Sequence, residues 1–213
     1  MLQKPRDYDT AASYDSDFER LPVGGYVVEI LRMEETVTPK TNTAMVVVSF
    51  DISEGDYKGY FSKQYKRDKS REVTSGREAK WRGTYNVFPY TNEGLTNPSF
   101  KGLLVCIEKS NYGFKIDWPL NMESFKGKKL GILFREEEYE GYDGTVKTSV
   151  KACATRTVDC INNEEFNVPA KKTLNKNSAS VPSSHGTTGN ASQSVYTSQE
   201  YTPVTVEDDD LPF

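Results

Sequence analysis

Hydrophobic and polar positions along the first three quarters of the chain follow the patterns of β-strands. Residues 26–33 and 44–52 are short runs of β-branched and large apolar side chains, and both faces of the second run are apolar, as in a central strand. A third run, 57–66, is rich in aromatic residues and begins after a Glu-Gly-Asp turn. Two later runs, 129–137 and 145–157, flank an Asp-Gly turn signal, which predicts a β-hairpin.

One further segment has the periodicity of a helix. Four apolar side chains fall at i, i+3, i+4 and i+7: Phe100, Leu103, Leu104 and Ile107. Asn97 can cap this helix, and Pro98 suits its first position. Asn111 and Gly113 can end it. We therefore expect a helix between the third and the fourth strand.

The elements then follow the order strand, strand, strand, helix, strand, strand. This is the order of the OB-fold, a partly open Greek-key barrel that binds oligonucleotides. We therefore predict a mainly β domain, with a five-stranded OB-fold-like barrel and one helix between strands 3 and 4. A small antiparallel sheet with a packing helix is the alternative. Residues 67–96 exceed a minimal OB-fold, and we expect them to form an inserted loop or a short extra element.

The composition changes abruptly after Val168. Residues 171–206 are mostly small and polar, with almost no consecutive apolar residues, so they cannot bury enough apolar surface to offset the entropy of ordering. We predict a disordered tail, which as a flexible coil would have an end-to-end distance of roughly 35–40 Å. The predicted domains are a polar leader, a binding domain, a disordered linker and an acidic tip: 1–20, 21–168, 169–206 and 207–213.

Charge is distributed unevenly along the chain. The formal net charge is -4, but residues 57–135 carry 16 Lys and Arg against 7 Asp and Glu, a net +9. The segments on either side, 1–56 and 136–168, carry net charges of -6 and -5. A basic middle between acidic flanks is expected when one face of a protein meets a polyanion.

Within the basic middle, cations and aromatic residues alternate. Binding single strands without sequence preference needs cations for phosphates and flat aromatic faces for bases. As a strand, 57–66 would place Tyr57, Phe61, Lys63 and Tyr65 on one face. We predict that the DNA-binding residues are Tyr57, Lys58, Tyr60, Lys63, Tyr65, Lys66, Arg67, Lys69, Arg71, Lys80, Trp81, Arg82 and Lys128.

Several of the aromatic residues have a structural alternative. Phe61 and Phe88 are more typical of a core, and Tyr85 is evenly balanced between core and surface. Trp81 has a cation on each side, which is unusual for a core position, so we favour an exposed or half-exposed Trp81 that stacks a base.

Two further charged clusters border the predicted site. Lys126, Lys128 and Lys129 could extend the phosphate path, although a solvated strand end explains them equally well. The acidic run in 136–144 would repel phosphates, so we expect that turn to point away from bound DNA.

No enzymatic constellation is found, and we expect no catalytic residue, no metal and no cofactor. The only histidine, His185, lies in the polar linker, and no phosphate-cradling glycine motif is present. Cys106, Cys153 and Cys160 form no CxxC pair and are expected to be small buried thiols. Residues 1–6 lack an apolar signal region, and no run could span a bilayer. We expect a soluble, intracellular protein with no membrane partner.

The sequence ends with six residues that suit partner docking: Asp208, Asp209, Asp210, Leu211, Pro212 and Phe213. An acidic run at a terminus is ordinarily solubilising. Here, however, a terminal Phe offers a ring for an apolar pocket and a carboxylate for a nearby cation. The aspartates add electrostatic steering toward a basic rim.

This ending closely resembles the C-terminal tip of bacterial single-stranded DNA-binding proteins. In that family an OB-fold core binds single strands, while the tip docks onto replication, recombination and repair enzymes. The core departs from the bacterial pattern, because about twenty polar and acidic residues precede its first strand. In 18–67 and 125–160 it is instead similar to bacteriophage-encoded single-stranded DNA-binding proteins. The resemblance implies phage or host enzymes as partners and the cytoplasm of a bacterial host. It carries over no oligomeric state, so homo-oligomerisation stays open.

Three alternatives to DNA coating follow from the same residues. An adaptor whose core binds protein would explain the acidic flanks. A nuclease would need the carboxylates at 7–19 or 136–140, which are more typical of a solvated leader and turn. RNA binding is a variant that stacking platforms equally permit. A further hypothesis is that the acidic tip competes with DNA for the basic 57–82 surface.

Overall fold

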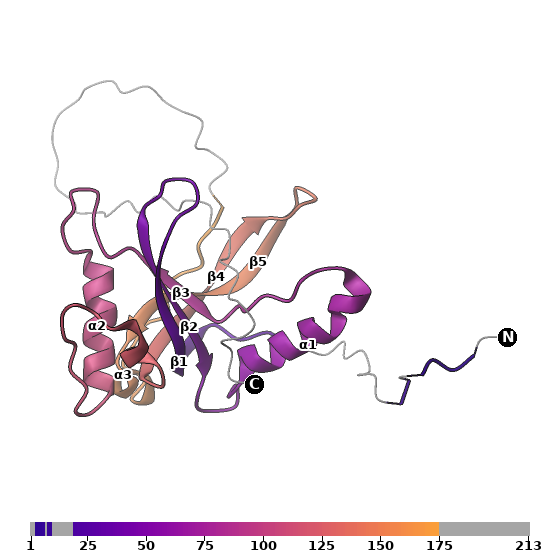
Figure 1. Ribbon diagram of the computed structural model, residues 1–213, viewed down its shortest axis with the longest axis horizontal. Coiled ribbons are helices and arrows are strands. Elements are labelled where there is room, and N and C mark those ends of the chain that lie inside the picture. The colour runs from indigo at the N-terminus through magenta and orange to yellow at the C-terminus, as the bar shows by residue number, and fades with distance from the viewer. Residues whose placement is uncertain (1–2, 7, 10–18, 175–213) are drawn as a thin grey trace, which may run out of the picture.

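The computed structural model describes residues 3–6, 8–9 and 19–174. Most of the predicted leader, nearly all of the linker and the whole tip lie outside the described residues. The described part is a five-stranded antiparallel sheet in the order β3-β2-β1-β4-β5, flanked by helices (Figure 1). Its elements are β1 Gly24–Val37, β2 Ala44–Ile52, α1 Tyr60–Ser75, β3 Thr84–Val87, α2 Pro98–Ser110, the 3-10 helix η1 Met122–Phe125, β4 Lys129–Glu140, β5 Val146–Arg156 and α3 Val158–Asn162.

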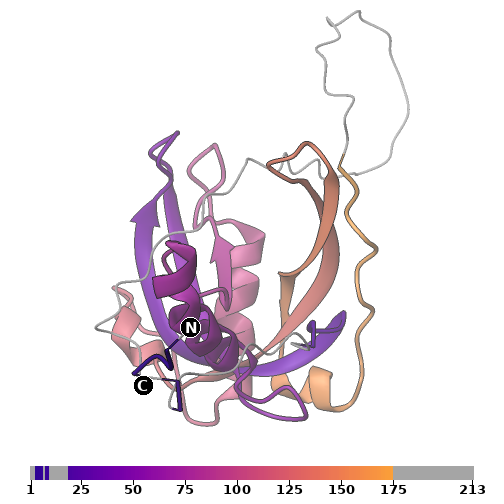
Figure 2. The ribbon, with the colours of Figure 1, turned by 90° about the vertical axis from the view of Figure 1, so that its right-hand side faces the viewer.

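Four of the five predicted strands are confirmed. The bounds of β2 match the prediction, β1 is longer than predicted, and β4 and β5 form the expected hairpin. β1 is the middle strand. Its residues 24–29 pair with β4, and its residues 28–37 pair with β2. The sheet curves strongly: β2 lies on one side, β4 and β5 lie on the other, and β1 runs from the second side to the first (Figure 2).

The prediction of a third strand at 57–66 is wrong. This segment is a turn followed by the first part of α1, and the third strand, β3, lies within the stretch expected to be an inserted loop. Residues 57–72 contain no β-branched residue and are rich in Lys, Arg and Gln, which favour helices. Phe61 and Tyr65, four residues apart, are both buried, as expected for one face of a helix.

A carboxylate from β2 caps the start of α1. The N-cap position is Gly59, which has no side chain to satisfy the first helical N–H groups. Asp51, at the end of β2 and almost fully buried, accepts hydrogen bonds from Phe61 N at 2.9 Å and Ser62 N at 3.0 Å. A residue distant in sequence therefore fixes where the helix begins and how it leaves the sheet.

The helix α2 forms as predicted. Asn97 accepts a hydrogen bond from Ser99 N at 2.9 Å, and Pro98 is the first helical residue. The four apolar residues at helical spacing are buried. Asn111, at the C-terminal end, exchanges hydrogen bonds with both backbone groups of Lys129. This contact fixes the end of α2 to the start of β4.

The core lies between the concave side of the sheet and the two longer helices. Phe50, Phe61 and Phe134 meet there with ring centroids 5.6–6.1 Å apart. On the opposite side of β1 and β4, Ile161 of α3 packs where Gly131 has no side chain. Phe61 is therefore a core residue, as predicted.

Residues 171–174, assigned by sequence to the linker, lie along the outer half of β4. Lys172 exchanges backbone hydrogen bonds with Glu136 and Glu138, and the Lys171 ammonium is 2.9 Å from a carboxylate oxygen of Glu138. This is the part of β4 that β1 does not cover, because their pairing stops at Gly24. None of the helices in the described ranges is long and apolar enough to cross a membrane.

Candidate nucleic-acid interface

The outer side of α1 carries a stripe of lysines. Lys63, Lys66 and Lys69 are exposed, while Phe61 and Tyr65 face the core. Successive steps of three residues turn a helix by about 300°, so the three lysines occupy an arc of about 120°. Residues 57–82 carry nine Lys and Arg against three Asp and Glu, a net +6. The helix therefore presents concentrated positive charge to solvent.

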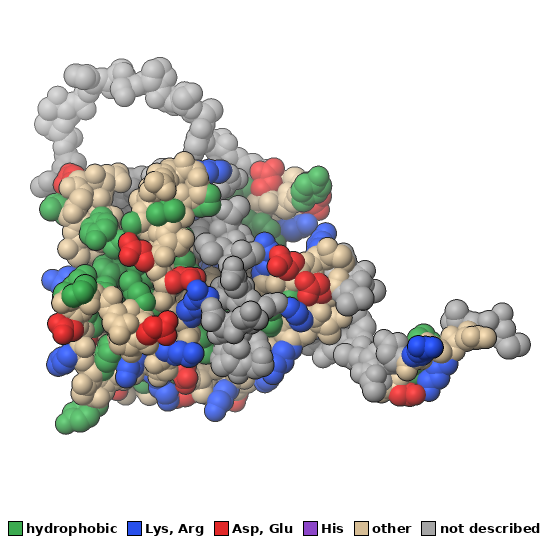
Figure 3. Space-filling view, viewed as in Figure 1, with side chains coloured by type: hydrophobic (Ala, Val, Ile, Leu, Met, Phe, Trp, Pro, Cys, Tyr) green, Lys and Arg blue, Asp and Glu red, His purple; other side chains and the backbone are tan. Residues whose placement is uncertain are grey.

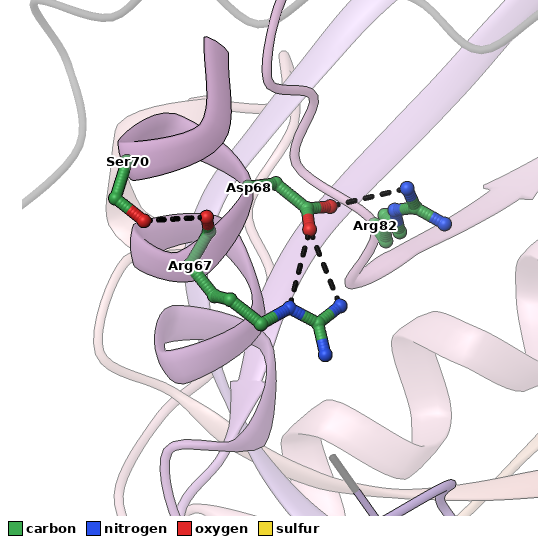
Figure 4. A network of polar contacts seen from close by, with 4 residues as sticks. All are labelled: Arg67, Asp68, Ser70 and Arg82. Atoms are coloured by element: carbon green, nitrogen blue, oxygen red, sulfur yellow. Dashed lines mark hydrogen bonds and ion pairs between the residues drawn. The ribbon is translucent and has the colours of Figure 1, made fainter. Parts of the chain in front are cut away.

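A partly buried carboxylate, that of Asp68, holds α1 against the segment that leads into β3 (Figure 4). One oxygen of Asp68 accepts from Arg67 at 3.2 Å, and the other accepts from Arg82 at 3.1 Å. The Asp68 side chain is only 17% exposed, so water screens its ion pairs with Arg67 and Arg82 less than it screens a pair between two fully exposed side chains. Arg82 remains largely exposed on its other side and joins the basic surface of α1.

The prediction that Trp81 is exposed or half-exposed is wrong, so its ring is not available on the surface to stack a base. Trp81 is 4% exposed, its Nε1 donates to Gly83 O at 3.1 Å, and its ring lies 5.8 Å from that of Tyr65. Tyr65 is only 7% exposed, which also excludes it as an exposed platform. Lys80 and Arg82 are exposed, as expected where inward and outward side chains alternate along an extended chain.

Tyr57 and Tyr60 are half-buried where the chain before β1 meets α1. The Tyr57 hydroxyl donates to Glu19 at 2.9 Å, and Tyr60 accepts from Leu21 N at 3.1 Å. The hydrogen bond to Glu19 raises the pKa of Tyr57, and burial raises the pKa of Tyr60. Together with Lys63, Glu19 and Asp56 they line a shallow pocket of about 290 Å³. Their hydroxyls thus have structural partners, although the pocket opens beside the lysine stripe.

The other predicted cations lie just before α1, on α1, and around the start of β4. Lys58 is exposed just before α1, and Arg71 is half-buried on the helix. Lys128 is half-buried, with its ammonium 4.7 Å from the centre of the Phe114 ring. Lys129 bonds Glu54 at 2.7 Å, which raises the pKa of Lys129. Figure 3 shows Lys and Arg side chains spaced along the lower edge of the molecule as far as α1, with Asp and Glu among them.

Sequence reasoning missed the exposed aromatic residues. Phe88, predicted to be core, is 37% exposed, while Tyr85 is half-buried and burial raises its pKa. Most of the exposed aromatics lie in turns and connections outside the basic 57–82 segment, and this placement is the signal that could have identified them. The exposed aromatic residues from β3 onward are Phe88, Tyr90, Tyr112, Trp118, Tyr139 and Tyr142.

The turns and connections divide between two ends of the molecule. The β1–β2 turn, the connection before α2 and the acidic β4–β5 turn project from the same end in both views (Figures 1 and 2). The connection after α2 and the turn before α1 lie toward the other end (Figure 1). The lysine stripe and the acidic turn are thus on different parts of the surface.

The described residues contain no group of three or more His, Cys, Asp or Glu placed to hold a metal ion. The three cysteines are free and half-buried. Burial raises the pKa of Cys106 and Cys153, which disfavours their reactive thiolate forms.

No protein-family model matches the chain, and no curated protein matches it either. What the chain does is therefore inferred from its own residues and their arrangement.

Proposed function

We propose that this protein binds single-stranded DNA with little sequence preference, as a coating protein in replication, recombination or repair. The observation that carries the proposal is the set of exposed cations on α1 and beside it. We name as the α1 surface Lys58, Lys63, Lys66, Lys69, Lys80 and Arg82. Asp51 and Asp68 hold this surface in place, so the cations are arranged before any ligand binds.

The fold supports an oligonucleotide as the ligand. The antiparallel order β3-β2-β1-β4-β5, with a helix between β3 and β4, is that of an OB-fold barrel opened between β3 and β5. We infer an OB-fold-like barrel into which α1 is inserted between the second and third strands. A strong positive charge on a fold of this kind suits the phosphates of a nucleic acid.

The tip adds a second activity to the proposal. Asp208, Asp209 and Asp210 followed by Leu211, Pro212 and Phe213 combine acidic steering with an apolar anchor. We infer that this tip docks onto replication or recombination enzymes of a phage or its host. The polar composition of 175–206 suits a tether that separates the tip from the binding domain.

The experiment that tests the proposal compares single-stranded DNA with duplex of the same length. The full chain is titrated against a labelled oligo-dT and a labelled duplex at low salt, with anisotropy as the measure. The proposal predicts saturable binding of the single strand and weaker binding of the duplex. No binding of either, together with capture of a protein by the domain alone, would support an adaptor instead. A Mg²⁺ control on labelled strands should leave them intact.

A further inference from the structure

The connection between α2 and β4, taken together with the first residue of β4 as residues 111–129, exposes two large aromatic side chains beside several cations. Trp118 is 66% exposed, and Tyr112 is fully exposed. Lys115 and Lys126 are also exposed, and Lys128 is half-buried. The segment carries four lysines against two carboxylates. The aromatic rings near the α1 surface differ in this respect, because Tyr65 and Trp81 are buried.

The connection is anchored from beneath. Phe125 is buried in the main core, and its ring contacts that of Phe114 at 5.6 Å in an edge-to-face arrangement. Ile116 N donates to Glu108 of α2 at 2.9 Å. These contacts hold the middle of the connection and leave Tyr112 and Trp118 outside it. The two rings are therefore presented on a fixed base, which lowers the entropic cost of binding.

The connection adjoins the α1 surface. Lys129, the first residue of β4, forms an ion pair with Glu54 at 2.7 Å, and Glu54 lies in the turn that leads from β2 into α1. Lys58 follows four residues later in the same turn. A strand that continues from α1 onto residues 111–129 would cross this turn, where the exposed carboxylates of Glu54 and Asp56 lie beside Lys58 and Lys129.

We propose that Trp118 and Tyr112 are base-stacking residues for the same single strand that α1 binds through its phosphates. Base stacking needs an exposed ring, and cations nearby favour a polyanionic ligand over an uncharged protein surface. The inference rests on the proposed function and extends it: the strand would run from α1 across the β2–α1 turn to the α2–β4 connection.

Tryptophan fluorescence tests this inference, because the chain has only two tryptophans and Trp81 is buried. Oligo-dT is added to the full-length wild type and to the variants Trp118→Phe and Trp118→Ala. We expect quenching in the wild type and its loss in both variants. We also expect Trp118→Ala to weaken binding at least 5-fold, since one stacked base contributes roughly 5- to 150-fold. Trp118→Phe keeps a ring and should retain most of the affinity.

Two controls make the outcomes distinct. Tyr142→Ala removes an exposed ring at the opposite end of the molecule and should leave affinity unchanged. Thermal melts of each variant report whether the fold is intact. Intact DNA binding with unchanged affinity in Trp118→Ala, or with quenching that persists in Trp118→Phe, would overturn the stacking role and leave the proposed function standing. Absence of any DNA binding by the wild type would overturn both.

Discussion

Removing the lysine stripe of α1 should weaken DNA binding in a way that depends on salt. The variant is the triple substitution of Lys63, Lys66 and Lys69 by Gln. All three side chains are exposed, so the fold should be preserved. Each phosphate contact to a single strand contributes about -0.7 to the slope of log K against log salt. Loss of three contacts therefore reduces the steepness of the slope by about 2.

The same relation gives the loss of affinity. At about 0.1 M salt, a change of about 2 in the slope corresponds to roughly 100-fold weaker binding, or about 3 kcal/mol. The difference between variant and wild type should shrink as salt rises and nearly vanish at about 1 M. Anisotropy titrations of labelled oligo-dT at several salt concentrations measure both quantities.

A matched control separates a local site from general electrostatic attraction. Substituting Gln for Lys40, Lys101 and Lys147 removes the same charge from exposed positions toward the end of the molecule that carries the acidic turn. We expect this control to change the slope by less than about 0.7, the contribution of one phosphate contact. Equal losses in the two triple variants, or an unchanged slope in the α1 variant, would refute the assignment of phosphate contacts to α1.

Three further predictions concern the scaffold that holds this surface. Asp51→Ala leaves the N–H of Phe61, which is buried, and that of Ser62, which is partly buried, without their acceptor at the start of α1, so the free energy of unfolding measured by chemical denaturation should fall by about 2–3 kcal/mol; a fall of less than about 0.5 kcal/mol would show that Asp51 does not cap the helix. A Cβ on Gly83 would collide with the backbone oxygen of Phe50, so Gly83→Ala should lower the free energy of unfolding by about 3 kcal/mol or more. Gly102→Ala meets open space in α2 and should raise it by about 0.5–1 kcal/mol; similar effects of the two changes would contradict the packing described. Burial raises the pKa of Tyr26 from 10.0 to about 12, so the contribution of Tyr26 to stability is complete below pH 10 and is lost as pH rises toward 12. Between these pH values the free energy of unfolding should fall more steeply in the wild type than in Tyr26→Phe. Parallel curves for the two proteins would refute the raised pKa of Tyr26.

Local patterns were sufficient to predict α2 and the β4–β5 hairpin. The helix has its cap, its first proline and its apolar face within fifteen residues, as Asn97, Pro98 and Phe100 show. The hairpin likewise carries its turn signal between its two strands, at Asp143 and Gly144. In both cases the interactions that decide the structure lie close together in the sequence.

The position of α1 depends on a partner that the local pattern does not contain. The aromatic residues of 57–66 favour a strand by propensity, whereas the residue that starts the helix is Asp51, on another element. The spacing of Phe61 and Tyr65 and the lack of β-branched residues were the available signals for a helix. Tertiary capping overrides a weak propensity here.

The charged part of the site was predictable and the aromatic part was not. The Lys and Arg residues that cluster in the sequence also lie together on the surface, because a helix exposes the side chains of its outer face over several turns. Trp81 was assigned to the surface because cations flank it, but an extended chain sends alternate side chains to opposite sides. Trp118 is exposed, and its position between Asp117 and Pro119, in the connection that follows α2, was the available signal.

The most direct test of the central claim is lysine footprinting with and without single-stranded DNA. The full chain is acetylated under limiting conditions, and mass spectrometry reports the modification of each lysine. The proposed function predicts protection of Lys58, Lys63 and Lys66 when oligo-dT is bound, and unchanged modification of Lys40 and Lys147. Uniform modification in the two samples, or protection confined to the end that carries Lys40 and Lys147, would contradict binding of the strand by α1.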